Sequence, residues 1–173
     1  MRRILILLAF SIMWSFPANS KDLTPATNLV GVSKINDTIF ANVNISGSEN
    51  INISQSMIKD IVKKELSGNK IKQGTGEGVP VLKVFVAGEG TGGGGIKFIV
   101  TVHLTTTIDS PYKKGNTIDA IIWTESISEE HIMKYDPKVK KIVNVSGKPE
   151  DKIISSLKNV IRNLCKDIKT VNM

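Results

Sequence analysis

A strict alternation of side-chain type between Ile96 and Ile108 constrains the fold of this chain more than any other feature of its sequence. Every second residue from Ile96 is apolar or β-branched, and the residues between are mostly polar, which is the pattern of a half-buried β-strand. Turn-forming residues follow in 109–116, and a second alternating run begins at Ile118. The sequence therefore predicts an antiparallel hairpin, whose apolar face other segments must cover because an isolated hairpin is marginal in water.

Two amphipathic helices are predicted to supply that cover. Between Ile53 and Leu66, apolar residues recur at spacings of three and four with lysines between them, and Ser54 or Asn52 can cap the first turn. The same spacing runs from Ile153 to Ile168, after a proline and two acidic residues that suit the start of a helix.

Two further strands are predicted at 39–45 and 81–87, and a short edge strand guarded by lysines at 139–145. The order strand-helix-strand-strand-strand-helix predicts an α+β fold. We expect one antiparallel sheet of four or five strands with two helices packed on one face. Since no repeat or second domain is evident, residues 21–173 are expected to form a single α+β domain.

The first twenty residues have the layout of a secretory signal peptide. Arg2 and Arg3 precede the apolar run Ile4–Phe16, which is shorter than the ~20 residues that a membrane-spanning helix needs. We therefore expect residues 1–20 to be removed on export. The remaining protein is expected to be periplasmic or secreted, and not an integral membrane protein.

The formal net charge of +7 limits the classes of partner. A solvated surface rich in lysine explains it, and attraction to an anionic envelope polymer or to acidic lipid head groups is the alternative. Nucleic acid is a poor candidate because aromatic residues are scarce and no basic run is interleaved with stacking side chains.

Motifs for catalysis, cofactors and metals are missing from the sequence. Cys165 is the only cysteine and falls in the apolar stripe of the second helix, where we expect an inert thiol, with a disulfide between chains as the alternative. His103 and His131 are the only histidines, and they do not form the i, i+4 pair of a helical metal site. The glycine tract 88–95 spells G-x-G-x-x-G, but the predicted flanking elements are both strands, which favours a flexible hairpin loop over a phosphate site. We expect a non-enzymatic protein without cofactor or metal.

The order of elements resembles small secreted bacterial envelope proteins in which two helices pack on one face of an antiparallel sheet. Examples are the lipoprotein of the lipopolysaccharide-transport barrel and the N-terminal domain of the Tol-system propeller protein. The segments that carry the resemblance are the helix ending at Leu66, the strand 80–84, the strand containing Trp123 and the closing segment 167–172. No cysteine lies near the expected cleavage site, and in this the chain departs from the lipoproteins.

The export pattern, the missing catalytic motifs and this resemblance together favour a non-enzymatic exported protein that binds an envelope protein or an envelope polymer in an assembly or accessory role. The alternative is a periplasmic small-ligand or lipid-binding protein that uses the space between helices and sheet, or the glycine tract. Contacts are expected at the edge strand 139–145 or on the uncovered face of the sheet, although ordinary strand composition would give a similar pattern. The candidate binding residues are His103, Trp123, Thr101, Thr105, Gly90 and Gly93.

Overall fold

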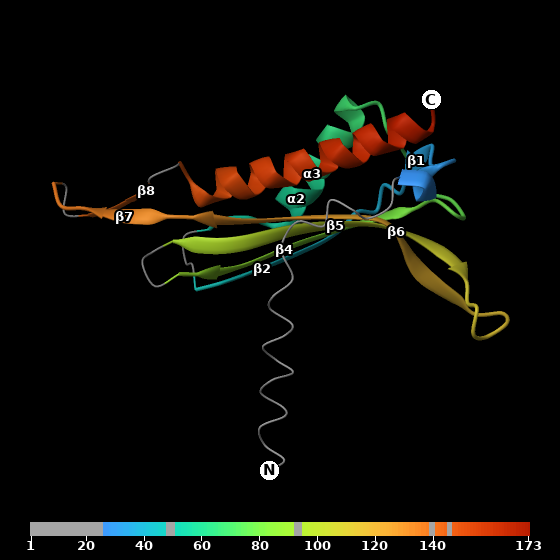
Figure 1. The fold of residues 1–173 in the computed structure, drawn as a ribbon, viewed down its shortest axis with the longest axis horizontal. Coiled ribbons are helices and arrows are strands. Elements are labelled where there is room, and N and C mark those ends of the chain that lie inside the picture. The colour runs from blue at the N-terminus through green and yellow to red at the C-terminus, as the bar shows by residue number, and fades with distance from the viewer. Residues whose placement is uncertain (1–25, 48–50, 92–94, 139–140, 145–146) are drawn as a thin grey trace, which may run out of the picture.

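The chain folds into an elongated α+β structure in which two helices lie across one face of a four-stranded sheet (Figure 1). The computed structural model describes residues 26–47, 51–91, 95–138, 141–144 and 147–173. The helical elements are a 3-10 turn η1 (Ala26–Leu29), α2 (Gln55–Gly68) and α3 (Pro149–Val171). The strands are β1 (Lys34–Ile35), β2 (Phe40–Ser46), β3 (Lys72–Gln73), β4 (Val81–Gly90), β5 (Ile96–Asp109), β6 (Thr117–His131), β7 (Met133–Asp136) and β8 (Lys141–Asn144).

The four strands of the sheet are ordered β2-β4-β5-β6. The pairs β4–β5 and β5–β6 are antiparallel, as predicted, whereas β2 and β4 are parallel. The parallel pair arises because α2 carries the chain back along the sheet between the two strands. The predicted α+β class and the two covering helices are confirmed.

Two short strand pairs lie outside the four-stranded sheet. Strands β1 and β3 are parallel, and β7 and β8 form a hairpin at the far end of the molecule (Figure 1). The strand expected at 139–145 is found at Lys141–Asn144, but as the partner of β7 rather than as an edge of the main sheet; residues 139, 140 and 145 lie outside the described residues.

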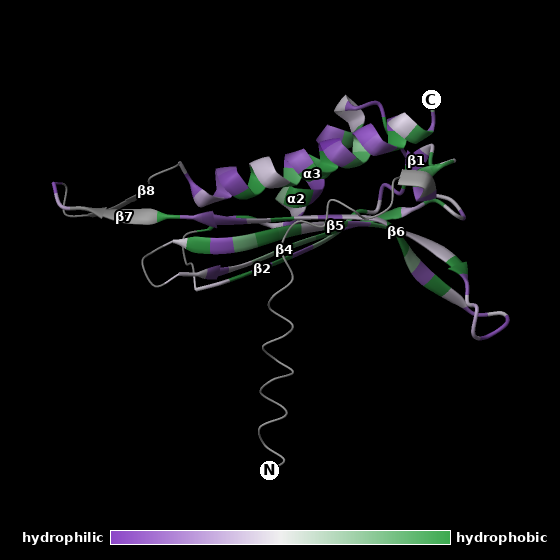
Figure 2. Ribbon diagram, in the orientation of Figure 1, coloured by the Kyte–Doolittle hydropathy of each residue, from purple (hydrophilic) through white to green (hydrophobic). Residues whose placement is uncertain are grey.

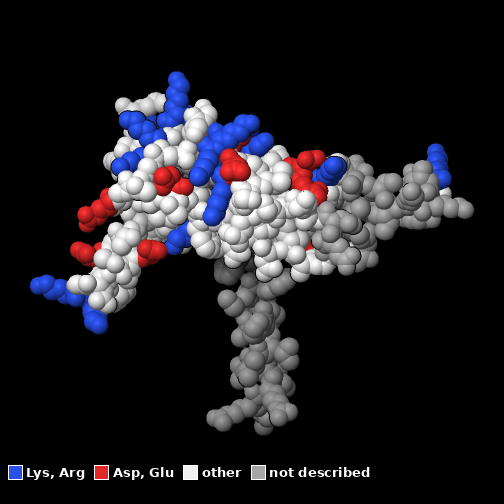
Figure 3. Space-filling model, turned by 180° about the vertical axis from the view of Figure 1, so that it is seen from behind, with Lys and Arg blue, Asp and Glu red and all other residues white. Residues whose placement is uncertain are grey.

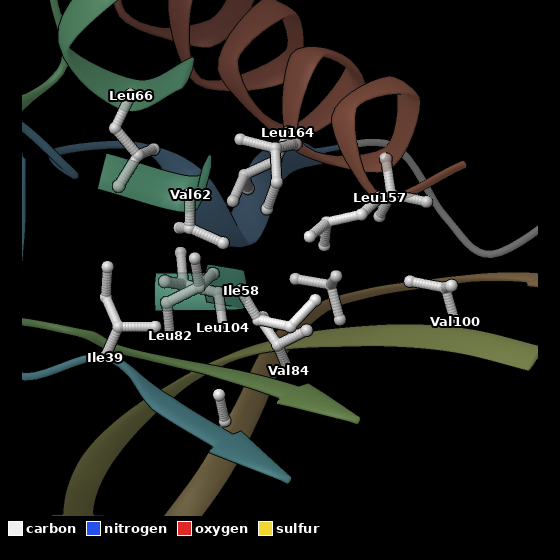
Figure 4. Close-up of a cluster of buried hydrophobic side chains, with 14 of the residues drawn as sticks. Ile39, Ile58, Val62, Leu66, Leu82, Val84, Val100, Leu104, Leu157 and Leu164 are labelled. Atoms are coloured by element: carbon white, nitrogen blue, oxygen red, sulfur yellow. The ribbon is translucent and has the colours of Figure 1, made fainter. Parts of the chain in front are cut away.

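The hydrophobic core fills the space between the helices and the sheet. In Figure 4, Val62 and Leu66 of α2 and Leu157 and Leu164 of α3 point toward the side chains of the strands, which include Leu82, Val84, Val100 and Leu104. Ser54 caps α2 by accepting a hydrogen bond from the Met57 backbone N–H at 3.2 Å. Figure 2 shows hydrophobic and hydrophilic residues alternating along the strands, as one covered face requires. None of the helices in the described part of the chain is long and apolar enough to cross a membrane.

A β-bulge interrupts the central hairpin where it leaves the sheet. Leu104 is paired with Trp123 but the next residue, Thr105, is paired with Ile121, so Ile122 is an extra residue on β6. Strand β4 ends its pairing at the same level, because Val81 is opposite Thr105. Beyond this point β5 and β6 continue as a two-stranded ribbon, residues 106–120, which projects from the body of the protein (Figure 1). We call this segment the hairpin arm.

Candidate functional site

The side of the sheet opposite the helices is not covered by any of the described elements, and we call it the open face. Strand register places residues from all four strands in transverse rows on this face. One row crosses the sheet from Phe40 through Lys83 and His103 to Thr124, and the next from Asn42 through Phe85 and Thr101 to Ser126. A third row consists of Asn44, Ala87, Ile99 and Ser128.

Three rings form the centre of the open face. The ring centroids of Phe40 and Phe85 are 5.7 Å apart, and those of Phe85 and His103 are 5.5 Å apart with an edge-on geometry. Such contacts are favourable beyond the area they bury, by roughly 0.5–1.5 kcal/mol per pair. Phe40 nevertheless keeps 47% of its surface exposed, so the cluster is accessible to solvent at this residue.

The polar groups around these rings are paired with one another across the strands. His103 Nδ1 and Thr124 Oγ1 are 2.8 Å apart, and Thr101 Oγ1 and Ser126 Oγ are 2.9 Å apart. Desolvation lowers the pKa of His103 below its usual 6.5, and the positive charge of Lys83 lowers it further. Both effects favour the uncharged form of the His103 ring.

Trp123 lies on the other face of the sheet, which corrects the expectation that it shares the open face with His103. Its Nε1 donates a hydrogen bond of 3.0 Å to Oδ2 of Asp167 in α3. The bulge at Ile122 is the cause, because one extra residue reverses the side to which every following residue of β6 points. Trp123 thus belongs to the helix–sheet interface.

The same reversal turns two carboxylates of β6 toward α3. Asn163 donates a hydrogen bond of 2.8 Å to Oε1 of Glu125, and Ser156 donates one of 2.7 Å to Oε1 of Glu129. Burial raises the pKa of Glu125, while the hydrogen bond from Asn163 lowers it and the charge of Asp167 raises it. These contacts are structural, since they join the edge strand to the helix.

The remaining predicted site residues are Thr105, Gly90 and Gly93. Thr105 is buried, with 4% of its surface exposed, and its hydroxyl donates to the Val81 carbonyl oxygen at 3.3 Å at the root of the hairpin arm. Gly90 packs against the backbone of Gly47, whose carbonyl oxygen a Cβ at position 90 would collide with. Gly93 lies outside the described residues. Of the six predicted residues, Thr101, His103 and Thr105 follow one another on the same side of β5, and Thr105 is the buried one of the three.

The strand β2 forms one free edge of the open face. Within the described part of the chain it pairs with β4 alone, and its seven residues, FANVNIS, include no charge and no proline. Exposed edges are commonly protected by such residues against pairing with other chains. The opposite edge, β6, carries several carboxylates and is crossed by α3. The edge of β2 is therefore the less protected of the two.

Phe40 and Phe85 are the residues of this site that reasoning from the sequence missed. Each occupies the polar side of its strand, Phe40 with Asn42 and Asn44, and Phe85 with Lys83. A large aromatic residue on the solvent side of a predicted strand was the signal that could have identified them.

An open cleft of about 390 Å³ lies away from this face, beside η1 and the bulge. Its walls include Val30, Lys34, Glu77 and Ile122. The space between helices and sheet, where a ligand was expected as the alternative, is instead filled by the core. In the described ranges, no three His, Cys, Asp or Glu side chains lie together as metal ligands would.

Comparison with known proteins finds similar solved structures but no matching family model or curated protein. No protein-family model matches the sequence, and no curated protein matches it. Among solved structures, a minor lipoprotein from Acinetobacter baumannii is similar with a TM-score of 0.34 and 12% identity, covering 82% of this chain and 93% of that chain. The rare lipoprotein B from Shewanella oneidensis has a TM-score of 0.31 and 15% identity, covering 75% and 90%. Such low scores do not transfer a function, and the resemblance to the Tol-system domain stays a prediction.

Proposed function

We propose that this chain is a non-enzymatic, exported protein that binds another protein through the free edge of β2 and the adjoining open face. In this mode the partner contributes an extended segment that pairs with β2 and extends the sheet by one strand. The observation that carries the proposal is the unprotected edge of β2 beside an exposed aromatic cluster. Export rests on the N-terminal pattern of residues 1–20.

The side chains on both faces of β2 favour an added strand. On the helix side, Val43 and Ile45 pack on the core but remain partly exposed, and none of the described strands lies on their outer side. On the open face, Phe40 presents its exposed ring beside Asn42 and Asn44. A strand with alternating apolar residues would bury these surfaces. Its backbone would form hydrogen bonds with the outward-facing N–H and C=O groups of β2.

Photo-crosslinking in cells of the organism that expresses the protein tests this proposal. A photoreactive amino acid replaces Asn44 on the open face at the edge, and in a second variant it replaces Lys63, which is exposed on α2. We expect one dominant adduct from position 44 and none from position 63. Mass spectrometry of the adduct should identify a peptide of extended, alternating sequence from the partner.

A substitution at the edge separates strand addition from contact by chance. Replacing Asn42 with Lys places a charge beside the incoming strand, and such charges protect natural edges from pairing. We expect it to abolish the adduct at position 44 without changing the melting temperature, since Asn42 is exposed. Equal adducts at positions 44 and 63, or an adduct that survives Asn42→Lys, would contradict the proposal.

The cleft beside η1 supports small-ligand binding as a second candidate function. Its volume is within the range of ligand sites, roughly 300–1,000 Å³, and Lys34 and Glu77 supply charges of both signs at its wall. Ligand binding to the folded state raises the melting temperature. A melting-temperature increase with a metabolite or lipid that Ile122→Arg abolishes would favour this function over protein binding.

A further inference from the structure

The hairpin arm ends in a surface whose composition differs from the rest of the open face. The arm is a two-stranded ribbon of four residue pairs, from Thr106 with Ala120 to Asp109 with Thr117. A hydrogen bond of 2.8 Å from the Ser110 N–H to the Asn116 carbonyl oxygen closes the turn. An isolated two-stranded ribbon is only marginally stable in water. Because the arm extends beyond the hydrophobic core, core packing does not explain its length.

An ion pair fixes the arm to the body at its root. Nζ of Lys83 on β4 lies 2.9 Å from Oδ2 of Asp119, and the Thr107 hydroxyl donates to the other oxygen of Asp119 at 3.3 Å. The pKa of Asp119 is lowered by the hydrogen bond and the charge of Lys83, so the carboxylate stays ionised. The ion pair joins the root of the arm to β4, and the arm projects from the sheet beyond it (Figure 1).

The tip of the arm presents one aromatic residue and two lysines. Tyr112 has 93% of its surface exposed, and Lys113 and Lys114 next to it are exposed as well. Neither lysine forms an ion pair with any of the described residues. Figure 3 shows basic side chains at the end of the arm, well separated from the larger basic region over the helices.

An aliphatic pair lies behind the tip, one residue pair closer to the body than Asp109 and Thr117. Ile108 and Ile118 face each other across the ribbon and remain 43% and 40% exposed. The tip therefore carries two cations and an amphipathic ring, and the two apolar side chains lie behind it, beyond the exposed Asp109. Lysine ammonium groups are attracted to anionic lipid phosphates, tyrosine prefers the membrane–water interface, and isoleucine gains by leaving water.

We propose that the tip of the hairpin arm docks on the surface of an anionic phospholipid bilayer. Lys113 and Lys114 bind the lipid phosphates, and Tyr112 lies at the level of the head groups. The two lysines outnumber the one carboxylate in 109–114, Asp109, so the charge of the tip is complementary to such a surface. A narrow projecting ribbon also reaches a flat membrane before the body does. This inference is independent of the proposed binding at β2, which lies on another part of the sheet.

A dye at the tip tests the docking directly. Pro111→Cys, labelled with an environment-sensitive fluorophore, reports on the tip while leaving Tyr112 and both lysines in place. The native Cys165 does not take up the label because it is buried. With the full chain, we expect fluorescence to rise on addition of vesicles made of equal parts phosphatidylcholine and phosphatidylglycerol. Vesicles of phosphatidylcholine alone should give no rise.

Charge reversal at the tip and at a matched site identifies the groups responsible. In the labelled protein, Lys113→Glu with Lys114→Glu should weaken vesicle binding by at least about 25-fold, since a lysine near an anionic surface contributes about fivefold. Lys63→Glu with Lys64→Glu, an exposed pair on α2, should leave the signal unchanged.

Tyr112→Ser should weaken the binding to anionic vesicles while preserving its salt dependence. No rise with anionic vesicles, an equal rise with neutral ones, or equal losses from the two lysine pairs would overturn the proposal. Circular dichroism of each variant checks that the fold is retained.

Discussion

Two truncations in the same strand test which face of the sheet is covered. Leu104 and Ile99 both lie in β5, and replacement of either by Ala removes three carbon atoms. Leu104 is fully buried beneath the helices, whereas Ile99 is on the open face with 40% of its surface exposed. The pair therefore holds strand and amount of removed surface constant and changes only the face.

The expected magnitudes follow from burial. Three buried methylene-sized groups are worth about 2.4 kcal/mol by transfer, and the cavity left in a packed core raises the cost of Leu→Ala to about 3–4 kcal/mol. For Ile99 the exposed part contributes nothing and no cavity forms, so the cost is about 1.4 kcal/mol or less. We expect the free energies of unfolding of the two variants to differ by about 2 kcal/mol.

Urea denaturation followed by circular dichroism measures both values. With a slope of about 2 kcal/mol per molar urea, the midpoint should fall by about 1.5–2 M for Leu104→Ala and by about 0.7 M or less for Ile99→Ala. Equal decreases would refute the reasoning, because Ile99 would then be covered in solution. Repeating the titration at several protein concentrations would reveal whether a second copy provides that cover.

Three further predictions concern the Glu125 carboxyl, two glycines and the Cys165 thiol. Glu125→Gln should increase stability at neutral pH, because burial raises the pKa of this carboxyl and penalises its charged form in the fold; denaturation at several pH values should show the gain disappearing as pH falls through that pKa. Gly90→Ala should cost about 1–3 kcal/mol in thermal melts through collision with Gly47, whereas Gly68→Ala, which has free space at the end of α2, should add up to about 1 kcal/mol. Burial raises the pKa of the Cys165 thiol to about 11, so iodoacetamide at about pH 8 should label it only in urea, and labelling of the folded protein would contradict its burial.

The layers of the fold follow from local patterns that can be recognised in the sequence. Alternation along β5 and the three- and four-residue spacing in α2 and α3 each define one apolar side, and only a helices-on-sheet arrangement buries all three. The caps agree with this, since Ser54 begins α2 and Pro149 begins α3 as expected. Such features depend on neighbouring residues in the chain, and therefore they were predictable.

The composition of the site was less predictable, because it depends on register. Ile121 and Ile122 are both apolar, so the alternation in β6 fits either residue on the covered side, and the bulge between them cannot be located from hydropathy. One unpaired residue was enough to move Trp123 to the helix side. The contact of Phe40 with Phe85 likewise requires β2 to be beside β4, and only the crossover through α2 places it there.

The hairpin arm could not be predicted from the sequence for a different reason. The alternation of β5 continues unchanged from Leu104 to Ile108, as if the sheet continued with it. The sheet ends there because β4 begins its pairing at Val81. The exposure of Ile108 and Ile118 follows from the length of a neighbouring strand and not from their own sequence pattern.

Amide hydrogen exchange along β2, resolved by NMR, tests most directly that this edge is free to accept a strand. Along Phe40–Ser46, we predict that amides directed at β4 are protected while the alternate amides exchange rapidly, since an edge strand pairs on one side only. Strand β5, paired on both sides, should be protected throughout its length beside β4 and β6. Continuous protection of β2 equal to that of β5 would show that the edge is already occupied, and it would contradict the proposed binding mode.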